Sequence, residues 1–517
     1  MISASTRRGS PMEWCMSVFP ASCESCTSIP RGSTSTEVPM AGTHPRSRRQ
    51  IMRDLAILVA PTVATACTTG NPDAPAPTPG GAGPVPKSLN GFEFWQPWPI
   101  DQPTHGGPIG WKQLSEAFNA TTTNKVQVTT PAGDYIAAVQ ASISAGTPPD
   151  GWQADQQWMV VYASKGASAP LDDLIKRDKW DKASIFPSAY ETMTWNGRVW
   201  GMMQHPDIVF MWYATGLLKE NGVDPAKLPM TWQDLDVAAQ KATRKQGDGF
   251  DFVGFTPHLG TDWQVILAQS NGAKLVSDDG KAVQFDAPEV VEAIEWIKGH
   301  VTRLGGMGTI GNWQKLVPGG DGQAPGTPTA GADIFAQKRM AAVVGGNWTA
   351  DNIRRANRRM SQTLEFAVGP VPSGPQGAKD VKSNVYSGGI LEVARRGGAK
   401  IDQVWEFMKF TATKEGGLNV QRNTADVSAS REAARDPSIL RNPDTGLGRK
   451  EFYALFDTGV GSRTIKHPAT IELTAEFARP IWTYLGDQTM NIRDALKEAS
   501  QAAQAKVDAI LASLPKA

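Results

Sequence analysis

Residues Trp195–Leu235 read WNGRVWGMMQHPDIVFMWYATGLLKENGVDPAKLPMTWQDL, the most distinctive passage of the chain. The end of this passage carries a helix start. Thr231 and Asp234 are spaced as a capping box, in which each side chain accepts a hydrogen bond from a free backbone N–H of the first turn. Apolar residues follow at helical spacing, at Leu235 and Ala238. A helix is therefore expected to begin at about residue 231.

Upstream of this passage, strand and helix patterns alternate. GFEFW and KVQVTT place apolar residues at every second position, as half-buried strands do. Each is followed by apolar residues at helical spacing. The order strand, helix, strand, helix predicts a parallel sheet with crossover helices. The apolar positions are Phe92, Phe94, Trp111, Leu114, Phe118, Val126, Val128, Tyr135, Val139 and Ile143.

Downstream of the passage, three more helices are expected. Asp286 and Glu289, with Pro288 in the first turn, resemble a second capping box before an apolar face that continues to Val301. A further helix is expected through residues 404–411, and a long amphipathic helix from Asn491 to Leu514. The Gly- and Pro-rich stretch 305–331 is expected to be a loop.

The N-terminal region has the pattern of an export signal. Ser47–Arg53 reads SRRQIMR, an apolar run follows from Leu55 to Ala66, and Cys67 comes next. The paired arginines indicate a twin-arginine signal. The sequence ATAC before and at Cys67 resembles a bacterial lipoprotein box, which implies that Cys67 is lipidated and becomes the first mature residue. Residues 1–39, before the second methionine at Met40, are interpreted as an upstream extension, 40–67 as the signal, and 68–89 as a Pro/Gly-rich tether.

Composition excludes several classes of protein. The 517 residues carry a net charge of +1, which argues against nucleic-acid binding. All four cysteines lie at or before Cys67, so the folded body needs no disulfide. The six histidines show no pair at metal-ligand spacing, so no metal and no cofactor are expected. The motifs G-x-S-x-G, H-E-x-x-H and the P-loop are absent from the sequence, which argues against the enzymes that use them.

An ordered set of segments resembles the extracellular solute-binding proteins of ABC importers, the family that includes maltose-binding protein. The resemblance covers roughly residues 90 to 515, and it departs from the family pattern at Gly151 and Ala214. The segments are FEFW, SEAFN, KVQV, DYIAAVQASISAGTPPD, ASAPLDDLI, the passage Trp195–Leu235, IFAQKRMAAVVGGNW, SGGILEVARR and VWEFMKFTATKEG.

This resemblance implies a two-lobed α/β fold of the type II periplasmic-binding-protein kind. Each lobe is expected to be a sheet flanked by helices, with a ligand cleft between the lobes. Residues 90–203 plus 333–388 are expected to form one lobe, and 208–332 plus 389–517 the other. The chain would cross between lobes near residues 203–207 and again near 386–390.

The resemblance also places candidate ligand-binding residues in the cleft. A sugar has apolar C–H faces and polar edges, so a cleft for it needs aromatic plates, carboxylates and close backbone approach. Alternatives remain open: Trp95 could pack under the first helix, Asp155 could cap a helix, and His205 could be structural. Trp98, Trp195, Trp200, Trp212 and Trp232 are assigned to packing. The candidates are Trp348, Trp95, Trp263, Trp152, Asp155, His205, Asp207, Gly388 and Gly389.

The function implied by the resemblance is extracellular capture of a small solute, a mono- or oligosaccharide, by hinge closure, and its delivery to an ABC permease. The protein is expected to act as a monomer, held by its lipid on the outer face of the cytoplasmic membrane. A polyol, a phosphate ester or a peptide remains an alternative ligand. An exported carbohydrate-active enzyme and a surface adhesin are the alternatives from other classes.

Overall fold

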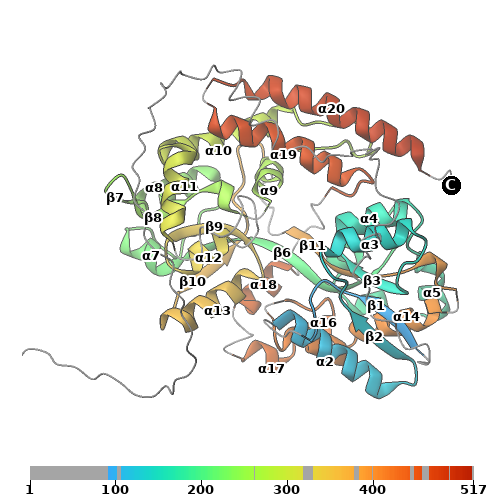
Figure 1. Ribbon diagram of the computed structural model, residues 1–517. Coiled ribbons are helices and arrows are strands. Elements are labelled where there is room, and N and C mark those ends of the chain that lie inside the picture. The colour runs from blue at the N-terminus through green and yellow to red at the C-terminus, as the bar shows by residue number, and fades with distance from the viewer. Residues whose placement is uncertain are drawn as a thin grey trace, which may run out of the picture. The chain divides into compact units, whose positions relative to one another are not determined.

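The structure is a computed structural model, shown in Figure 1. It describes residues 91–101, 106–260, 262–317, 330–377, 384–398, 400–424, 426–442, 448–456, 465–487 and 489–514. The expected signal, Cys67 and the tether lie outside these residues.

One nine-stranded sheet runs through the described part of the chain, in the order β2-β1-β3-β11-β6-β9-β8-β7, with β10 also paired to β6. β1 pairs in parallel with both β2 and β3, which confirms the predicted parallel arrangement. A separate two-stranded sheet joins β4 and β5. The strands are β1 (Gly91–Trp95), β2 (Lys125–Thr129), β3 (Gly151–Ala154), β4 (Thr194–Trp195), β5 (Arg198–Val199), β6 (Met202–Ala214), β7 (Arg244–Gln246), β8 (Gly249–Phe255), β9 (Met340–Gly346), β10 (Phe366–Gly369) and β11 (Asn384–Val393).

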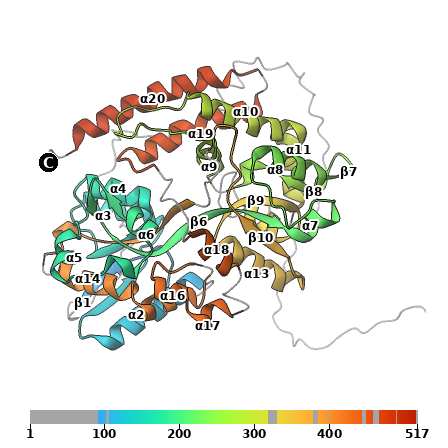
Figure 2. The same cartoon turned by 180° about the vertical axis from the view of Figure 1, so that it is seen from behind.

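The long strand β6 belongs to both halves of this sheet. Its first part pairs antiparallel with β11, from Met202 opposite Leu391 to Val209 opposite Asn384. Its last part pairs with β9 and β10 instead. Figures 1 and 2 show β6 passing between two groups of elements, which form the two lobes of the fold.

The β6–β11 ladder is interrupted twice. The register shifts between Val385 and Ser387, and again between Gly389 and Ile390. Between the two shifts, Ser387, Gly388 and Gly389 face Asp207, Pro206 and His205 respectively. Bulges of this kind bend a strand and re-aim its side chains. The segment that carries His205 and Asp207 is therefore set off from the regular sheet on either side.

The first half of the sheet is covered by helices from distant parts of the sequence. Its core includes the aromatic side chains of Phe94, Phe118 and Phe407, with the Phe118 and Phe407 centroids 5.1 Å apart. α14 packs against β1 and α15 packs against α2, although both follow residue 389. We therefore propose that residues 400–421 belong to the first lobe; the other expected boundaries stay predictions. These helices are α2 (Gly106–Thr121), α3 (Tyr135–Ser144), α4 (Gln156–Ser164), α5 (Asp172–Arg177), α6 (Pro187–Thr192), α14 (Lys400–Thr411), α15 (Lys414–Gln421), α16 (Arg431–Ala434) and α17 (Pro437–Leu440).

The second half carries the predicted helix start. Thr231 Oγ1 accepts from the N–H of Asp234 (3.1 Å), and the Asp234 carboxylate accepts from the N–H of Thr231 (3.2 Å), so the capping box is confirmed. The helices here are α7 (Thr215–Glu220), α8 (Trp232–Lys241), α9 (Trp263–Ser270), α10 (Pro288–Arg303), α11 (Gly306–Leu316), α12 (Ala330–Ala336), α13 (Thr349–Met360) and α18 (Arg449–Phe456).

Two expectations in this half are wrong. The residue that caps α10 is Ala287, without a side-chain bond, because the Asp286 carboxylate instead accepts from Ser500 (3.3 Å). The expected loop begins with a helix, α11. Its glycines are poor helix formers, but Ile310 and Trp313 lie three residues apart and are both fully buried, so packing overrides the low propensity. Residues 318–329 lie outside the described part.

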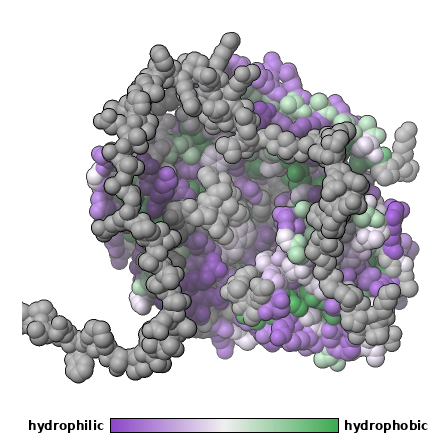
Figure 3. Space-filling model, viewed as in Figure 1, coloured by the Kyte–Doolittle hydropathy of each residue, from purple (hydrophilic) through white to green (hydrophobic). Residues whose placement is uncertain are grey.

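The C-terminal region forms a helical pair, α19 (Thr470–Gly486) and α20 (Ile492–Ser513), which pack against each other and against α10. The amphipathic helix expected from Asn491 to Leu514 is confirmed, and Asn491 caps it by accepting from the N–H of Asp494 (3.3 Å). Figure 3 shows hydrophilic residues over much of the described part of the face seen in Figure 1. Among the described helices, none combines the length and apolar character that a membrane span requires.

Candidate ligand-binding site

A cavity of about 420 Å³ opens beside the interrupted part of β6. Its walls come from the chain after β1, the first turn of α3, the end of β3, β6, the start of α13 and the loop after α15. The lining residues are Pro97, Trp98, Asp134, Tyr135, Ile136, Gln153, Ala154, Asp155, His205, Asp207, Trp348 and Asp426.

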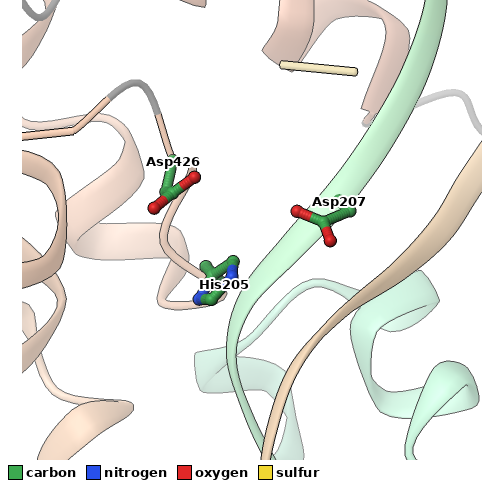
Figure 4. A group of neighbouring side chains, drawn as sticks. All are labelled: His205, Asp207 and Asp426. Carbon is green, nitrogen blue, oxygen red and sulfur yellow. The ribbon is translucent and has the colours of Figure 1, made fainter. Parts of the chain in front are cut away.

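Four of the nine residues expected at the site line this cavity: Asp155, His205, Asp207 and Trp348. They come from three separate segments, so the fold brings together residues that are far apart in the sequence. His205 and Asp207 share one face of β6 because side chains two positions apart in a strand point the same way. Figure 4 shows their side chains together with that of Asp426.

The two expected glycines make room for His205. A Cβ on Gly389 would lie 2.3 Å from His205 Cε1 and 2.3 Å from Gln153 Nε2. Gly388 has a φ of +148°, and a Cβ there would lie 2.3 Å from the His205 carbonyl oxygen. Gly389 therefore leaves room for the imidazole, and Gly388 allows the close approach of the two backbones at His205.

The indole of Trp348 also depends on a glycine. A Cβ on Gly346 would lie 2.2 Å from Cζ3 of Trp348, so the indole lies directly over the bare backbone of that residue. Trp348 is only partly buried and precedes α13. Trp98 provides a second indole at the cavity, with its centroid 6.5 Å from the imidazole of His205. The cavity thus has two aromatic plates, one of them at a position that the sequence had assigned to packing.

The other expected tryptophans lie in packing environments. Trp152 is fully buried and donates through Nε1 to Glu392 (2.9 Å). Trp263 is 1% exposed, and its ring meets that of Trp482 edge-on at 5.3 Å. Trp95 packs in a small cluster with Tyr135 and donates through Nε1 to Glu93. None of the three is among the described residues that line the cavity, and their contact with ligand stays a prediction.

The carboxylates at the site repel one another. Burial raises the pKa of Asp207 well above its ordinary value, and the negative charges of Asp155 and Asp426 raise it further. Burial also raises the pKa of Asp155, while nearby His205 lowers it. Asp155 is nevertheless exposed to solvent, because it faces the open cavity. Asp262, in a neighbouring cavity of about 320 Å³, has its pKa raised to about 6 by burial and by Asp155.

The lining of the cavity is predominantly acidic. It contains Asp134, Asp155, Asp207 and Asp426, and the described lining residues include neither lysine nor arginine. Asp426 was missed in the sequence because it lies in a loop, far along the chain from β6, with no motif around it. His205, Asp207 and Asp426 each offer a metal-ligating atom within 4.8 Å of the others. The arrangement can bind hydroxyl donors, positive charge, or both.

Comparison with known proteins identifies the family. Residues 105–418 match the family of bacterial extracellular solute-binding proteins. The maltotriose-binding protein of Pyrococcus abyssi is 21% identical over 334 residues, which are 64% of this chain and 66% of that protein. This chain thus spans just under two thirds of that relative. The sn-glycerol-3-phosphate-binding periplasmic protein UgpB of Escherichia coli K12 is 22% identical over 340 residues, 62% of this chain and 71% of its own.

Solved structures share the fold. An ABC substrate-binding protein from Listeria monocytogenes in complex with cycloalternan has a TM-score of 0.63 at 20% identity, covering 81% of this chain and 99% of its own. The GacH receptor of Streptomyces glaucescens, solved with acarbose, has a TM-score of 0.60 at 19% identity. The match covers 81% of this chain and 98% of the receptor chain. Because the family match covers more than half of the 517 residues, the protein belongs to the bacterial extracellular solute-binding proteins.

Proposed function

We propose that this protein captures a mono- or oligosaccharide outside the cell and delivers it to an ABC-type permease, without catalysis. The single observation that carries the choice of ligand is the lining of the cavity beside β6. It offers two indoles, Trp348 and Trp98, together with four carboxylates and one imidazole. Indoles cover the apolar faces of a sugar ring, and carboxylates accept from its hydroxyls. The maltotriose-binding relative and the cycloalternan complex support the same ligand class.

Stacking would supply much of the affinity. If Trp348 removes about 100 Å² of apolar sugar surface from water, at about 25 cal/mol per Å², it contributes roughly 2.5 kcal/mol. That corresponds to nearly a hundredfold in affinity. Hydrogen bonds to Asp155, His205 and Asp207 add less net energy, because each replaces a bond to water. They reject wrong stereoisomers by leaving buried polar groups unpaired.

A phosphate ester is the second candidate, because UgpB relatives bind sn-glycerol 3-phosphate. Phosphate is usually recognised by arginine or lysine. The described cavity lining has neither, and its four aspartates would repel a phosphate group. The sugar is therefore favoured over the phosphate ester at this cavity.

The experiment is a thermal-shift screen of the protein against mono- and oligosaccharides, polyols, glycerol 3-phosphate and peptides. Ligand that binds only the native state adds about 2.7 kcal/mol of stability at one hundred times its Kd. We expect a sugar to stabilise and glycerol 3-phosphate not to. The affinity of Trp348→Ala for that sugar should fall at least tenfold, and Trp348→Phe, which keeps a flat ring, should lose less. Stabilisation by glycerol 3-phosphate alone would reject the sugar. Cleavage of a glycoside during incubation would reject a purely binding role.

We also propose that the mature protein begins at Cys67 and is lipid-anchored. The observation behind this is the SRRQIMR signal, the apolar run and the cysteine that follows it. Cys67→Ser should move the protein from the membrane fraction to the soluble fraction. Mass spectrometry of the native N-terminus should find lipid on Cys67. A mature chain that retains residues before Cys67 would contradict this assignment.

A further inference from the structure

Three side chains of types that bind metal ions meet in the cavity beside β6. One ligand atom each of His205, Asp207 and Asp426 lies within 4.8 Å of the other two. Figure 4 shows the imidazole between the two carboxylates, with His205 and Asp207 on the strand and Asp426 on a loop. No motif in the sequence predicts this group, because Asp426 is far from His205 and Asp207 along the chain and comes close to them only in the folded protein.

The backbone holds this group in place. His205 and Asp207 lie on the three-residue segment between the two register shifts of β6 and β11. The loop that carries Asp426 is tied to the same strand, because the N–H of Ala429 donates to the Gln204 carbonyl (3.1 Å). The N–H of Asp426 itself donates to Thr424 Oγ1 (3.2 Å). The ligand atoms are thus presented from two anchored backbones rather than from long side chains.

The hydrogen-bond contact of His205 suits metal binding. Its Nδ1 lies 3.1 Å from the amide oxygen of Gln204. An amide oxygen only accepts hydrogen bonds, so this contact directs Nδ1 toward Gln204 and leaves Nε2 as the nitrogen available to an ion. Histidines that bind metals usually donate their other ring N–H to an oxygen in this way. His205 is 6% exposed, so the ring has little freedom to turn.

A separate observation points to a missing partner in the same cavity. The side-chain oxygen Oε1 of Gln153 is buried and has no hydrogen-bond partner among the described residues, and Gln153 is only 5% exposed. Gln153 lines the cavity with His205 and Asp207. A buried amide oxygen without a donor is unfavourable, because it has lost its hydrogen bonds to water and gained none in return. A cation, or a water molecule bound to one, would supply what this oxygen lacks.

We propose that His205, Asp207 and Asp426 form a binding site for one divalent cation. One imidazole and two carboxylates are a mixed N/O set, which suits Zn²⁺ or Mn²⁺ better than Ca²⁺ or Mg²⁺. Because the three ligand atoms lie within 4.8 Å of one another, a point in their plane lies at most about 2.8 Å from each of them. Zinc takes such ligands at about 2.0–2.2 Å, so small side-chain rotations close the site. Three protein ligands leave further coordination positions open toward the cavity.

The ion would also balance the charge of the cavity. The described lining has four aspartates and no basic side chain other than His205. Like charges this close are unfavourable in the poorly solvated interior of a protein. One divalent ion neutralises the charge of two carboxylates and also accepts the lone pair of the His205 imidazole.

The test is calorimetric titration of the full chain, freed of metal with EDTA and dialysed, with ZnCl2, MnCl2 and CaCl2 in separate runs. We expect one Zn²⁺ or Mn²⁺ per chain and weaker Ca²⁺ binding. Asp426→Asn should weaken Zn²⁺ binding at least tenfold, and so should His205→Gln. Asp262→Asn is the matched control, because this aspartate has a raised pKa but lies in the neighbouring cavity. Its Zn²⁺ affinity should stay within twofold of the unmodified protein.

Two results would overturn the site. One is the absence of stoichiometric binding of all three ions. The other is binding that Asp426→Asn leaves unchanged. Should His205→Gln fail to fold, Asp426→Asn decides alone, because Asp426 lies in a loop. The titration needs no sugar, so its failure would leave the proposed sugar capture untouched.

Discussion

Trp348, Trp98 and Asp426 reach the cavity beside β6 from three distant parts of the chain. Trp348 follows a Gly-Gly-Asn pattern and was expected at the ligand, and its indole does line the cavity. Trp98 and Asp426 line the same cavity but have no local pattern. Their place depends on how distant loops return to β6. Trp152 and Trp263 have suitable neighbours in the sequence, yet the fold buries both indoles in packing contacts.

Gly346 offers a test of the Trp348 indole that leaves the indole in the protein. Gly346→Ala would place a Cβ 2.2 Å from Cζ3 of Trp348, so the ring must move. We expect sugar affinity to fall by about the same factor as in Trp348→Ala, at least tenfold. Calorimetry with the sugar found by the screen measures it. Gly216→Ala is the control, because nothing lies within 4 Å of its added Cβ. Unchanged affinity in Gly346→Ala would contradict the stacking role.

Glu392 gives a pH dependence of stability. Burial raises its pKa to about 8, although Trp152 and Ser168 both donate to its carboxylate and lower it. The folded protein therefore holds a proton that the unfolded chain releases above its ordinary pKa of 4.5. The contribution of protonated Glu392 to the free energy of unfolding is fully present below pH 4.5. Between that pH and about pH 8 the free energy of unfolding falls by about 1.4 kcal/mol per pH unit.

Glu392→Gln removes this titration. The free energy of unfolding in urea, measured at pH 5 and pH 8, should fall less with pH in the variant than in the unmodified protein. The expected difference between the two slopes is on the order of 1 kcal/mol per pH unit. Parallel pH profiles of the two proteins would show that Glu392 is ionised in the folded state.

At the level of elements, local signals succeeded where they act within one turn. The capping box at Thr231 forms as the sequence predicts, and the long helix expected from Asn491 begins directly after that residue. α11 was missed because Gly306, Gly308 and Gly311 make its sequence resemble a loop. Its stability comes from Ile310 and Trp313, which are buried against other elements. Tertiary packing of this kind leaves no local signature, so helix propensity alone misassigns it.

Thr231 tests the start of α8. Thr231→Ala removes the acceptor for the N–H of Asp234 and should destabilise the protein by about 1 kcal/mol. Thr231→Ser keeps the hydroxyl and should lower the free energy of unfolding by at most a few tenths of a kcal/mol. Urea denaturation of the three proteins measures the effect. Equal losses in the two variants would mean that the methyl group, rather than the hydrogen bond, stabilises this turn.

At the level of the whole molecule, the order of segments along the chain predicted the two-lobed fold better than any one motif did. The parallel strands expected at the start are in the structure, and one long strand, β6, contains residues 203–207, where the resemblance implies a crossing. The sequence placed all residues after 389 in the second lobe, yet α14 and α15 return to pack on β1 and α2. Such a return reflects long-range packing, which a linear pattern does not encode.

Hinge closure is the expected response of this fold to ligand, because a ligand that touches both lobes favours the closed state by its differential affinity. We expect the radius of gyration from small-angle X-ray scattering to fall when the sugar is added. At the same sugar concentration, Trp348→Ala should show less compaction, because a smaller fraction of this variant has sugar bound. A radius that stays constant at saturating sugar would rule out a closing cleft.

The paired register shifts around His205 have a consequence for how the backbone exchanges with solvent. Only three residue pairs, His205–Asp207 with Ser387–Gly389, lie between the interruptions, and Pro206 has no amide hydrogen to contribute. Amide hydrogens in this short ladder should therefore exchange with deuterium faster than those of the regular pairing farther along β6. A bound sugar or ion would join β6 to the loop of Asp426 and slow that exchange. Deuterium uptake there would report occupancy of the site directly from the backbone.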